Sequence, residues 1–142
     1  MNLNKVFILG RLTGDPQLRR TASGQTVATM GLATNRTWTD KDGQKQEAVE
    51  FHSVVIWGKQ AENAAAFLIK GQIALVEGSI QTRAWTDKDG HERKATEIIA
   101  QNIQFGPKPG EKPAPAKPHK PIHTRPDNDF DDENVSQEML PL

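Results

Sequence analysis

The hexapeptide Trp-Thr-Asp-Lys-Asp-Gly occurs twice in this chain of 142 residues, at positions 38–43 and 85–90. An Asp-Gly pair between two strand-like runs is a strong local signal for a β-hairpin. Runs rich in β-branched and other apolar residues lie around these two turns, at 26–34, 49–57, 73–84 and 95–105. The sequence therefore predicts two hairpins within a mainly antiparallel β domain.

One more strand and a single helix complete the expected domain. Residues 6–12 form another β-rich run. Residues 60–70 carry alanine and leucine at helical spacing, and Lys70 followed by Gly71 suits the end of a helix. The order of three strands, one helix and two strands matches a five-stranded Greek-key barrel of the OB type. The predicted fold class is all-β, a barrel with one helix.

The composition changes where the barrel is expected to end. Seven of the nine prolines lie between residues 107 and 126, where few side chains are apolar and larger than alanine. Such a segment cannot bury enough surface to offset the entropy of ordering. The net charge is +2 over residues 1–106, +4 over 107–126 and −6 over 127–142. We therefore expect a folded domain at 1–106, a disordered linker at 107–126 and a disordered acidic tail at 127–142.

Catalytic and metal-binding patterns are missing from the sequence. The chain has no cysteine, its four histidines lack ligand spacing, and it contains no glycine-rich phosphate loop or nucleophile elbow. The paired aspartates of the two hexapeptides do not match a calcium loop, whose glutamate would fall on Val49, so turn formation is the better interpretation. We expect no metal, no cofactor and no enzymatic activity.

The hydrophobic segments are short. The apolar run at residues 6–9 is shorter than the core of a secretory signal, and no stretch approaches the roughly 20 apolar residues of a membrane helix. The absence of cysteine suits a reducing compartment. We expect a cytoplasmic protein without membrane attachment.

Large aromatic residues lie on the hairpin segments beside basic residues. Trp38 follows Arg36 by two positions, as Trp85 follows Arg83. Such rings are commonly buried, but an indole next to a polar turn is hard to bury. Alternation along a strand also places Trp57 on the face opposite its apolar neighbours. We interpret at least three of these four aromatics as exposed platforms and select all four as stacking residues: Trp38, Phe51, Trp57 and Trp85.

Exposed rings beside cations suit a ligand made of unpaired bases and phosphates. Every base has a π-face, and the stacking energy depends little on which base is stacked. Each basic residue taken alone also fits an ordinary solvated charge, but together they supply contacts to phosphates. The residues selected for this role are Lys5, Arg11, Arg36, Lys59, Lys70 and Arg83. The sequence predicts binding of single-stranded DNA without strong sequence preference.

Several motifs occur in order over residues 1–106 and together carry a family resemblance. They are Asn4-Lys5-Val6, Gly10-Arg11-Leu12, Gly14-Asp15-Pro16, residues 50–55, Gly58-Lys59, Lys70-Gly71, Val76-Glu77-Gly78 and residues 83–87. In sequence and spacing, this set resembles the bacterial single-stranded DNA-binding proteins. The resemblance implies an OB-fold core, a homotetramer wrapped by single-stranded DNA, and a role in replication, recombination and repair at the nucleoid.

The resemblance also assigns roles to single residues. The four aromatics fall on the stacking positions of the family, which often has Trp where Phe51 stands and Phe where Trp57 stands. These two substitutions exchange the ring and keep its function. His52 matches a family histidine associated with subunit contacts, so the resemblance implies a place at the oligomer interface.

The tail departs from the family pattern. Members commonly end in several aspartates directly followed by Ile-Pro-Phe or Leu-Pro-Phe, a tip that docks replication and repair proteins. Here the acidic run at residues 127–133 is followed by residues 134–138, and the chain ends Met139-Leu140-Pro141-Leu142 without adjacent aspartates. The residues expected to dock partners are Asp131, Asp132, Glu133, Leu140, Pro141 and Leu142. We expect weaker docking than in the family, and a merely solubilising tail is the alternative.

Two other classes of function stay open at this point. An OB-fold adaptor for replication restart, or another accessory adaptor, would act mainly through protein contacts, bind DNA weakly and form a dimer. An enzyme acting on nucleic acid, or its accessory domain, would need clustered carboxylates or a metal site.

Deletion of residues 127–142 is expected to tighten binding of single-stranded DNA at low salt. A tail of charge −6 tethered to a basic body competes with DNA phosphates at a high effective concentration. Titration with an oligo-dT strand at low and high salt measures the effect, which should fade as salt screens the tail. An unchanged affinity at low salt contradicts competition.

Overall fold

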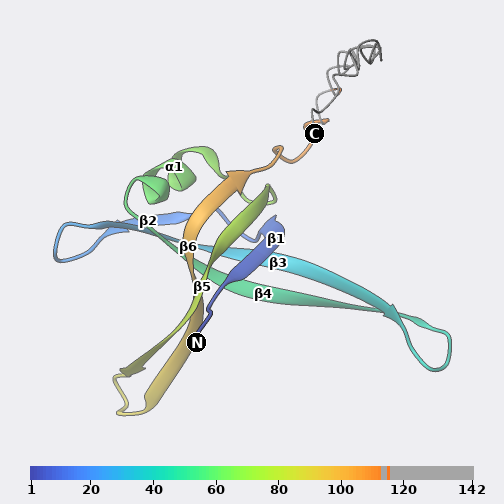
Figure 1. Cartoon of the computed structure of the whole chain (residues 1–142), viewed down its shortest axis with the longest axis horizontal. Helices are drawn as coiled ribbons and strands as arrows, with labels where there is room; N and C mark the ends of the chain where they lie inside the picture. The colour runs from blue at the N-terminus through green and yellow to red at the C-terminus, as the bar shows by residue number, and fades with distance from the viewer. Residues whose placement is uncertain (113–114, 116–142) are drawn as a thin grey trace, which may run out of the picture.

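Six strands and one helix form the described part of the chain, residues 1–112 and 115 of a computed structural model. In chain order the elements are β1 (Val6–Leu12), β2 (Gln17–Arg20), β3 (Thr26–Thr39), β4 (Lys45–Trp57), α1 (Lys59–Phe67), β5 (Ile73–Thr86) and β6 (Glu92–Phe105). Figure 1 shows their arrangement. Among these residues, α1 is too short to cross a membrane.

The strands join in a single sheet that closes into a barrel. Their order is β1-β5-β6-β4-β3-β2, and β1 also pairs with β3 through Arg11 and Leu12. This second pairing closes a ring of five strands and leaves β2 outside it, at the edge of β3. All pairings are antiparallel except that of β4 with β6. The five-stranded OB-type barrel predicted from the sequence is confirmed.

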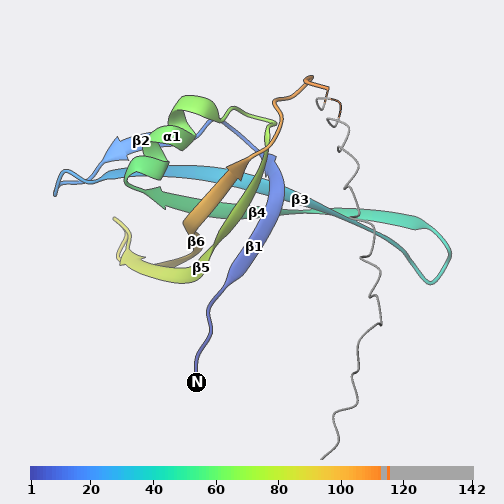
Figure 2. The same ribbon diagram turned by 45° about the horizontal axis from the view of Figure 1, so that its top comes forward.

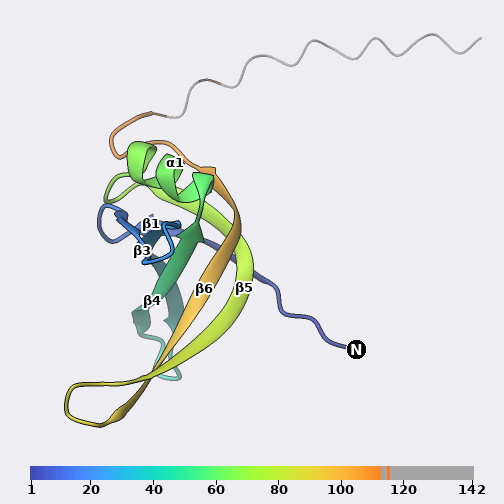
Figure 3. The ribbon, with the colours of Figure 1, turned by 90° about the vertical axis from the view of Figure 1, so that its left-hand side faces the viewer.

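Alternation along the strands fills the barrel. Leu32 of β3, Val54 and Ile56 of β4 and Val76 of β5 are fully buried in one cluster. The small side chains of Ala61 and Ala64 join this cluster from α1, which lies across one end of the barrel (Figures 2 and 3). The helix therefore closes the core on the side from which both long hairpins point away.

The strand β2 was not expected from the sequence. Its four residues are all exposed, so its sequence has no apolar alternation to reveal it. Pairing with β3 creates it, and a tight turn joins the two strands. In this turn the N–H of Gly24 donates to the carbonyl of Thr21 at 2.9 Å, with a φ of 85° at the glycine.

The helix ends earlier than predicted. It stops at Phe67 rather than Lys70, because Leu68 is extended, with a ψ of 141°. Gly71, which the sequence suggested as the helix end, lies in a separate turn closed by the N–H of Gln72 donating to Ile69 at 3.1 Å. Its φ of 83° is the value required at the third position of a type II turn.

Both long hairpins extend further than the sequence runs suggested. β3 and β4 stay paired as far as Thr39 and Lys45, and β5 and β6 as far as Thr86 and Glu92. These outer residues have no apolar alternation, because neither face of them packs on the core. We call residues 36–50 the β3–β4 arm and residues 83–97 the β5–β6 arm. The arms leave the barrel in different directions (Figure 1).

Substitution of Gly78 by alanine is expected to destabilise the fold by about 1–3 kcal/mol, the usual cost of overpacking. Gly78 lies at a bulge between β5 and β6, where an added Cβ would clash with the carbonyl oxygen of Ile99. Urea denaturation measures the change. Gly14→Ala is the matched control, because a Cβ there meets nothing within 4 Å. Equal stability of the two variants would contradict the steric argument.

Candidate nucleic-acid interface

Strand alternation sorts the predicted aromatics by face. Val54 and Ile56 point into the core, so Phe51 and Trp57 on the same strand point outward. On β5, Val76 points inward and Trp85 therefore points outward. Phe51 is 74% exposed, and the two tryptophans are less than half exposed. Three of the four predicted platforms thus lie on the outer face of the curved sheet.

The strand register places an arginine in line with each aromatic of β4. Arg11 pairs with Ala33, which pairs on its other side with Phe51. Directly paired residues share a face, so this row crosses three strands on the outside of the barrel. Two strand spacings separate the arginine from the ring, about 10 Å. A phosphate and its base fit such a separation, with the small alanine leaving the space between them open.

A second row repeats this arrangement. Arg19 of β2 pairs with Val27, and Val27 pairs with Trp57. Arg19 was not among the phosphate contacts predicted from the sequence, because its place on the outer face depends on the pairing of β2 with β3. The dipeptide Arg19-Arg20 was the available signal, but without the register it could not be assigned to a face.

The third outward aromatic lies on the β5–β6 arm. The guanidinium of Arg83 stacks over the Trp85 ring at 4.6 Å from its centroid. A groove of about 230 Å³ connects this arm with the second row, and its walls include Arg19, Trp57 and Arg83. The groove therefore links Trp57 to the arginine that stacks on Trp85.

The fourth predicted platform faces the other way. Trp38 lies an even number of residues from Leu32 along β3, so the two side chains project from the same face of the sheet. Leu32 is in the core, and Trp38 therefore projects from the inner face, where the β3–β4 arm runs beyond the barrel. Arg36 stacks over its ring at 4.7 Å. The structure therefore does not bring all four aromatics to one surface. The first residue of one hexapeptide, Trp38, lies on the inner face of its strand, and the first residue of the other, Trp85, lies on the outer face.

The predicted phosphate contacts differ in their present partners. Lys5 pairs with Glu77 at 2.5 Å, Lys59 with Glu62 at 3.3 Å, and Arg83 with Glu97 at 3.0 Å. Arg11 donates to the carbonyl of Gly71, and the backbone of Lys70 donates to Asp15. Within residues 1–112, Arg36 and Lys70 have no acidic side chain in salt-bridge distance.

The two hexapeptides form the same turn. Asp40 Oδ1 accepts the N–H groups of Asp42 and Gln44, and Asp87 Oδ1 accepts those of Asp89 and His91, all at 2.8–3.0 Å. The glycine that ends each turn has a positive φ. Each aspartate therefore acts as an internal cap for its hairpin.

These hydrogen bonds lower the pKa of both capping carboxyls below the ordinary value of 3.8. The largest contribution at Asp40 comes from the side-chain amide of Gln46, and at Asp87 from the side chain of Arg93. The backbone N–H groups of Gln44 and His91 contribute next. In each case, the bonds favour the charged form of the carboxyl.

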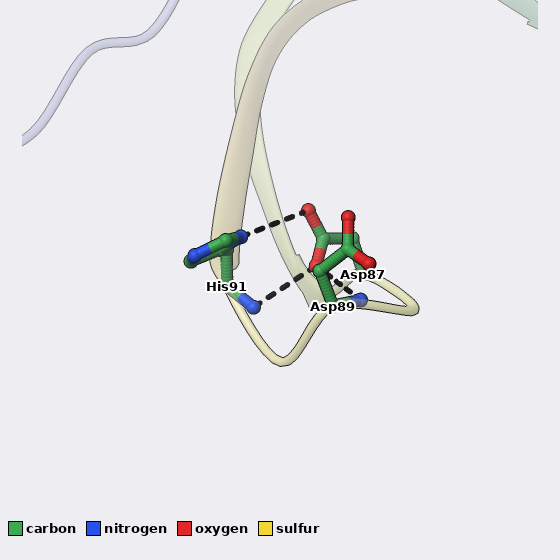
Figure 4. A group of neighbouring side chains, drawn as sticks. All are labelled: Asp87, Asp89 and His91. Atoms are coloured by element: carbon green, nitrogen blue, oxygen red, sulfur yellow. Dashed lines mark hydrogen bonds and ion pairs between the residues drawn. The ribbon is translucent and has the colours of Figure 1, made fainter.

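Asp87, Asp89 and His91 bring atoms capable of binding metal within 4.8 Å of one another (Figure 4). The turn itself explains this proximity. One Asp87 oxygen accepts two backbone N–H groups and the other accepts Arg93 at 2.8 Å. With both oxygens engaged by donors, the arrangement fits a hairpin cap better than a cation site.

His52 lies on β4, opposite Leu32 of β3, and shares the face of the strand that carries Val54. Its Nε2 is 2.9 Å from the hydroxyl of Thr34. The side chain is half-buried. The residues expected to dock partners, Asp131, Asp132, Glu133, Leu140, Pro141 and Leu142, lie outside the described residues.

The family profile described as the single-strand binding protein family matches residues 3–106. The chain belongs to this family. Among single-strand binding proteins, it is 48% identical over 103 residues to single-stranded DNA-binding protein 2 of Listeria innocua. It is 46% identical over 103 residues to single-stranded DNA-binding protein A of Bacillus subtilis. Each match covers 72% of this chain, and 64% and 59% of these relatives, so the chain spans less than two thirds of their length.

Two solved structures of single-strand binding proteins are similar to the barrel. One is the Plasmodium falciparum protein in complex with single-stranded DNA, with a TM-score of 0.68 and 29% identity over 74% of this chain and 96% of that one. The other is a deletion mutant of the Thermus aquaticus single-stranded DNA-binding protein, with a TM-score of 0.67 and 36% identity over 76% of this chain and 52% of that one.

The cap of the β3–β4 arm is expected to weaken only in strong acid. Since the pKa of Asp40 is lowered in the folded state, its stabilisation is complete above the unfolded value and is lost as the pH falls through the lower folded value. The amide shifts of Asp42 and Gln44, followed by NMR, should titrate together below pH 3.8. Asp40→Asn should abolish this titration, whereas Asp42→Asn should leave the Gln44 shift profile in place. Midpoints above the ordinary value would contradict the cap.

Proposed function

We propose that this chain binds single-stranded DNA without strong sequence preference and protects it. The observation that carries the proposal is the pair of rows in which an arginine and an outward aromatic ring lie two strands apart on the outer face. Base stacking contributes about 1–3 kcal/mol for each base and hardly depends on base identity. The rows thus supply a repeated contact for one base and one phosphate, which is the repeating unit of a single strand.

The proposed stacking residues are Phe51, Trp57 and Trp85 on the outer face, with Trp38 reached where the strand passes to the inner face of the β3–β4 arm. The proposed phosphate contacts are those expected from the sequence, with Arg19 added. The groove between Trp57 and Arg83 supports a path that joins the second row to the β5–β6 arm. A DNA strand that passes from the outer face of the barrel to the inner face of the β3–β4 arm curves around the barrel.

We further propose a role in replication, recombination and repair in the bacterial cytoplasm, at the nucleoid, and no catalytic activity. Family membership and the names of the bacterial relatives support this role. Residues 1–106 would form the DNA-binding domain, 107–126 the linker and 127–142 an acidic tail that docks replication and repair proteins.

We also infer that the protein works as a homotetramer. Phe7 and Leu9 point outward from β1 and are 65% and 64% exposed. Their partners on β5 include Leu75, so the apolar character continues across the two strands. An exposed apolar patch of this kind favours burial against another protein surface. A second copy of the chain fits that surface, and the half-buried His52 is the further interface residue proposed from the family resemblance.

Replacing Trp57 or Trp85 by alanine is expected to weaken binding of an oligo-dT strand by about 1–3 kcal/mol, since each substitution removes one stacking platform. Fluorescence titration at two salt concentrations, with duplex DNA as competitor, measures the loss. Phe67→Ala is the matched control, because this exposed aromatic lies on α1, away from the rows. Equal losses in all three variants would contradict the assignment of the outer face.

A mass measurement in solution accompanies the titration. Strong preference for single strands together with a tetramer is the expected result. Weak binding to DNA together with a dimer would instead favour an OB-fold adaptor that acts mainly through protein contacts.

A further inference from the structure

The two arms are copies of each other beyond the hexapeptide. Each residue of the second arm follows its counterpart by 47 positions, and three residues outside the hexapeptide coincide: an arginine, an alanine and a glutamate. The alanine pairs with the arginine in both arms. The glutamate follows two residues later on the same strand, at Glu50 and Glu97. Both arms therefore have an acid placed diagonally beside their stacked arginine.

The structure treats the two glutamates differently. Arg83 donates to Glu97 at 3.0 Å, and the Glu97 side chain is only 14% exposed. Glu97 also lines the groove that holds Trp57 and Arg83. Glu50 is exposed and, within residues 1–112, forms no ion pair with Arg36. Among the described residues, the arginine of one arm is thus paired with a carboxylate, and the arginine of the other arm is not.

We propose that Glu97 controls how the β5–β6 arm engages DNA, by holding Arg83 over Trp85 and competing with phosphate for its guanidinium. This inference rests on the proposed binding of single-stranded DNA and assigns a residue that tunes it. The β3–β4 arm, with Arg36 free of such a partner among the described residues, makes the first contacts. The β5–β6 arm joins when a phosphate displaces or shares the carboxylate.

The electrostatics of the groove support this order. A phosphate that approaches Arg83 meets a pair of almost zero net charge, and the nearby carboxylate repels it. Because Glu97 is largely shielded from solvent, its interaction with charges in the groove is screened less than that of the exposed Glu50. The guanidinium has further N–H donors, so a phosphate can bind one edge while Glu97 keeps another.

The test compares Glu97→Gln with Glu50→Gln in the full chain. Glutamine keeps the size and an oxygen that accepts from Arg83, so the change removes mainly the charge. We expect Glu97→Gln to bind oligo-dT roughly fivefold more tightly at low salt, as removal of one nearby like charge predicts. Its plot of log affinity against log salt should steepen by about 0.7, the value for one added phosphate contact. Glu50→Gln should change both quantities less.

A double variant, Arg83→Gln with Glu97→Gln, identifies the cation involved. The gain in affinity and the steeper salt dependence should disappear, because Arg83 is the group that Glu97 neutralises. Unchanged or weaker binding by Glu97→Gln, or equal gains in both single glutamate variants, would overturn the role of Glu97 while leaving DNA binding in place. Failure of the unaltered chain to bind oligo-dT would overturn the proposed function itself.

Discussion

The pairing of β1 with two different strands is the constraint on which the rest of the structure depends. β1 lies along β5 for most of its length and reaches β3 only through Arg11 and Leu12. At this seam, a side chain at Gly10 would approach the carbonyl oxygen of Ala33 to 2.6 Å, so the lack of a Cβ allows the close approach. Closure gives every strand an inside and an outside, and alternation then decides which residues can meet a ligand.

The outer face acquires its character from register rather than from composition. The net charge of the folded region is small, yet pairing places Arg11 and Arg19 each two strands away from an aromatic ring. Ala33 adds little bulk between the first pair, and Val27 between the second pair is fully buried. A weakly basic domain can therefore present a local pattern of cation and ring that suits a polyanion with exposed bases.

The arms show how one local sequence serves two environments. Both hexapeptides form the same aspartate-capped turn, because that turn depends only on residues within it. The tryptophans beside the turns nevertheless project from opposite faces of the sheet. Glu97 lies in a groove of the barrel surface, whereas its counterpart Glu50 lies on a strand edge open to solvent. Local geometry is repeated, while the electrostatics differ because the surroundings differ.

The sequence by itself determined what depends on neighbours along the chain: the two hairpin turns, the helix within a few residues, the order of elements that predicts a five-stranded barrel, and the aromatic and basic residue types that favour single-stranded DNA. Only the tertiary structure decided the short strand β2 and the position of Arg19 on the outer face. It also decided the opposite faces of Trp38 and Trp85 and the ion pair of Arg83 with Glu97. These features depend on register between strands far apart in the chain, and a shift of one residue moves every side chain to the other face.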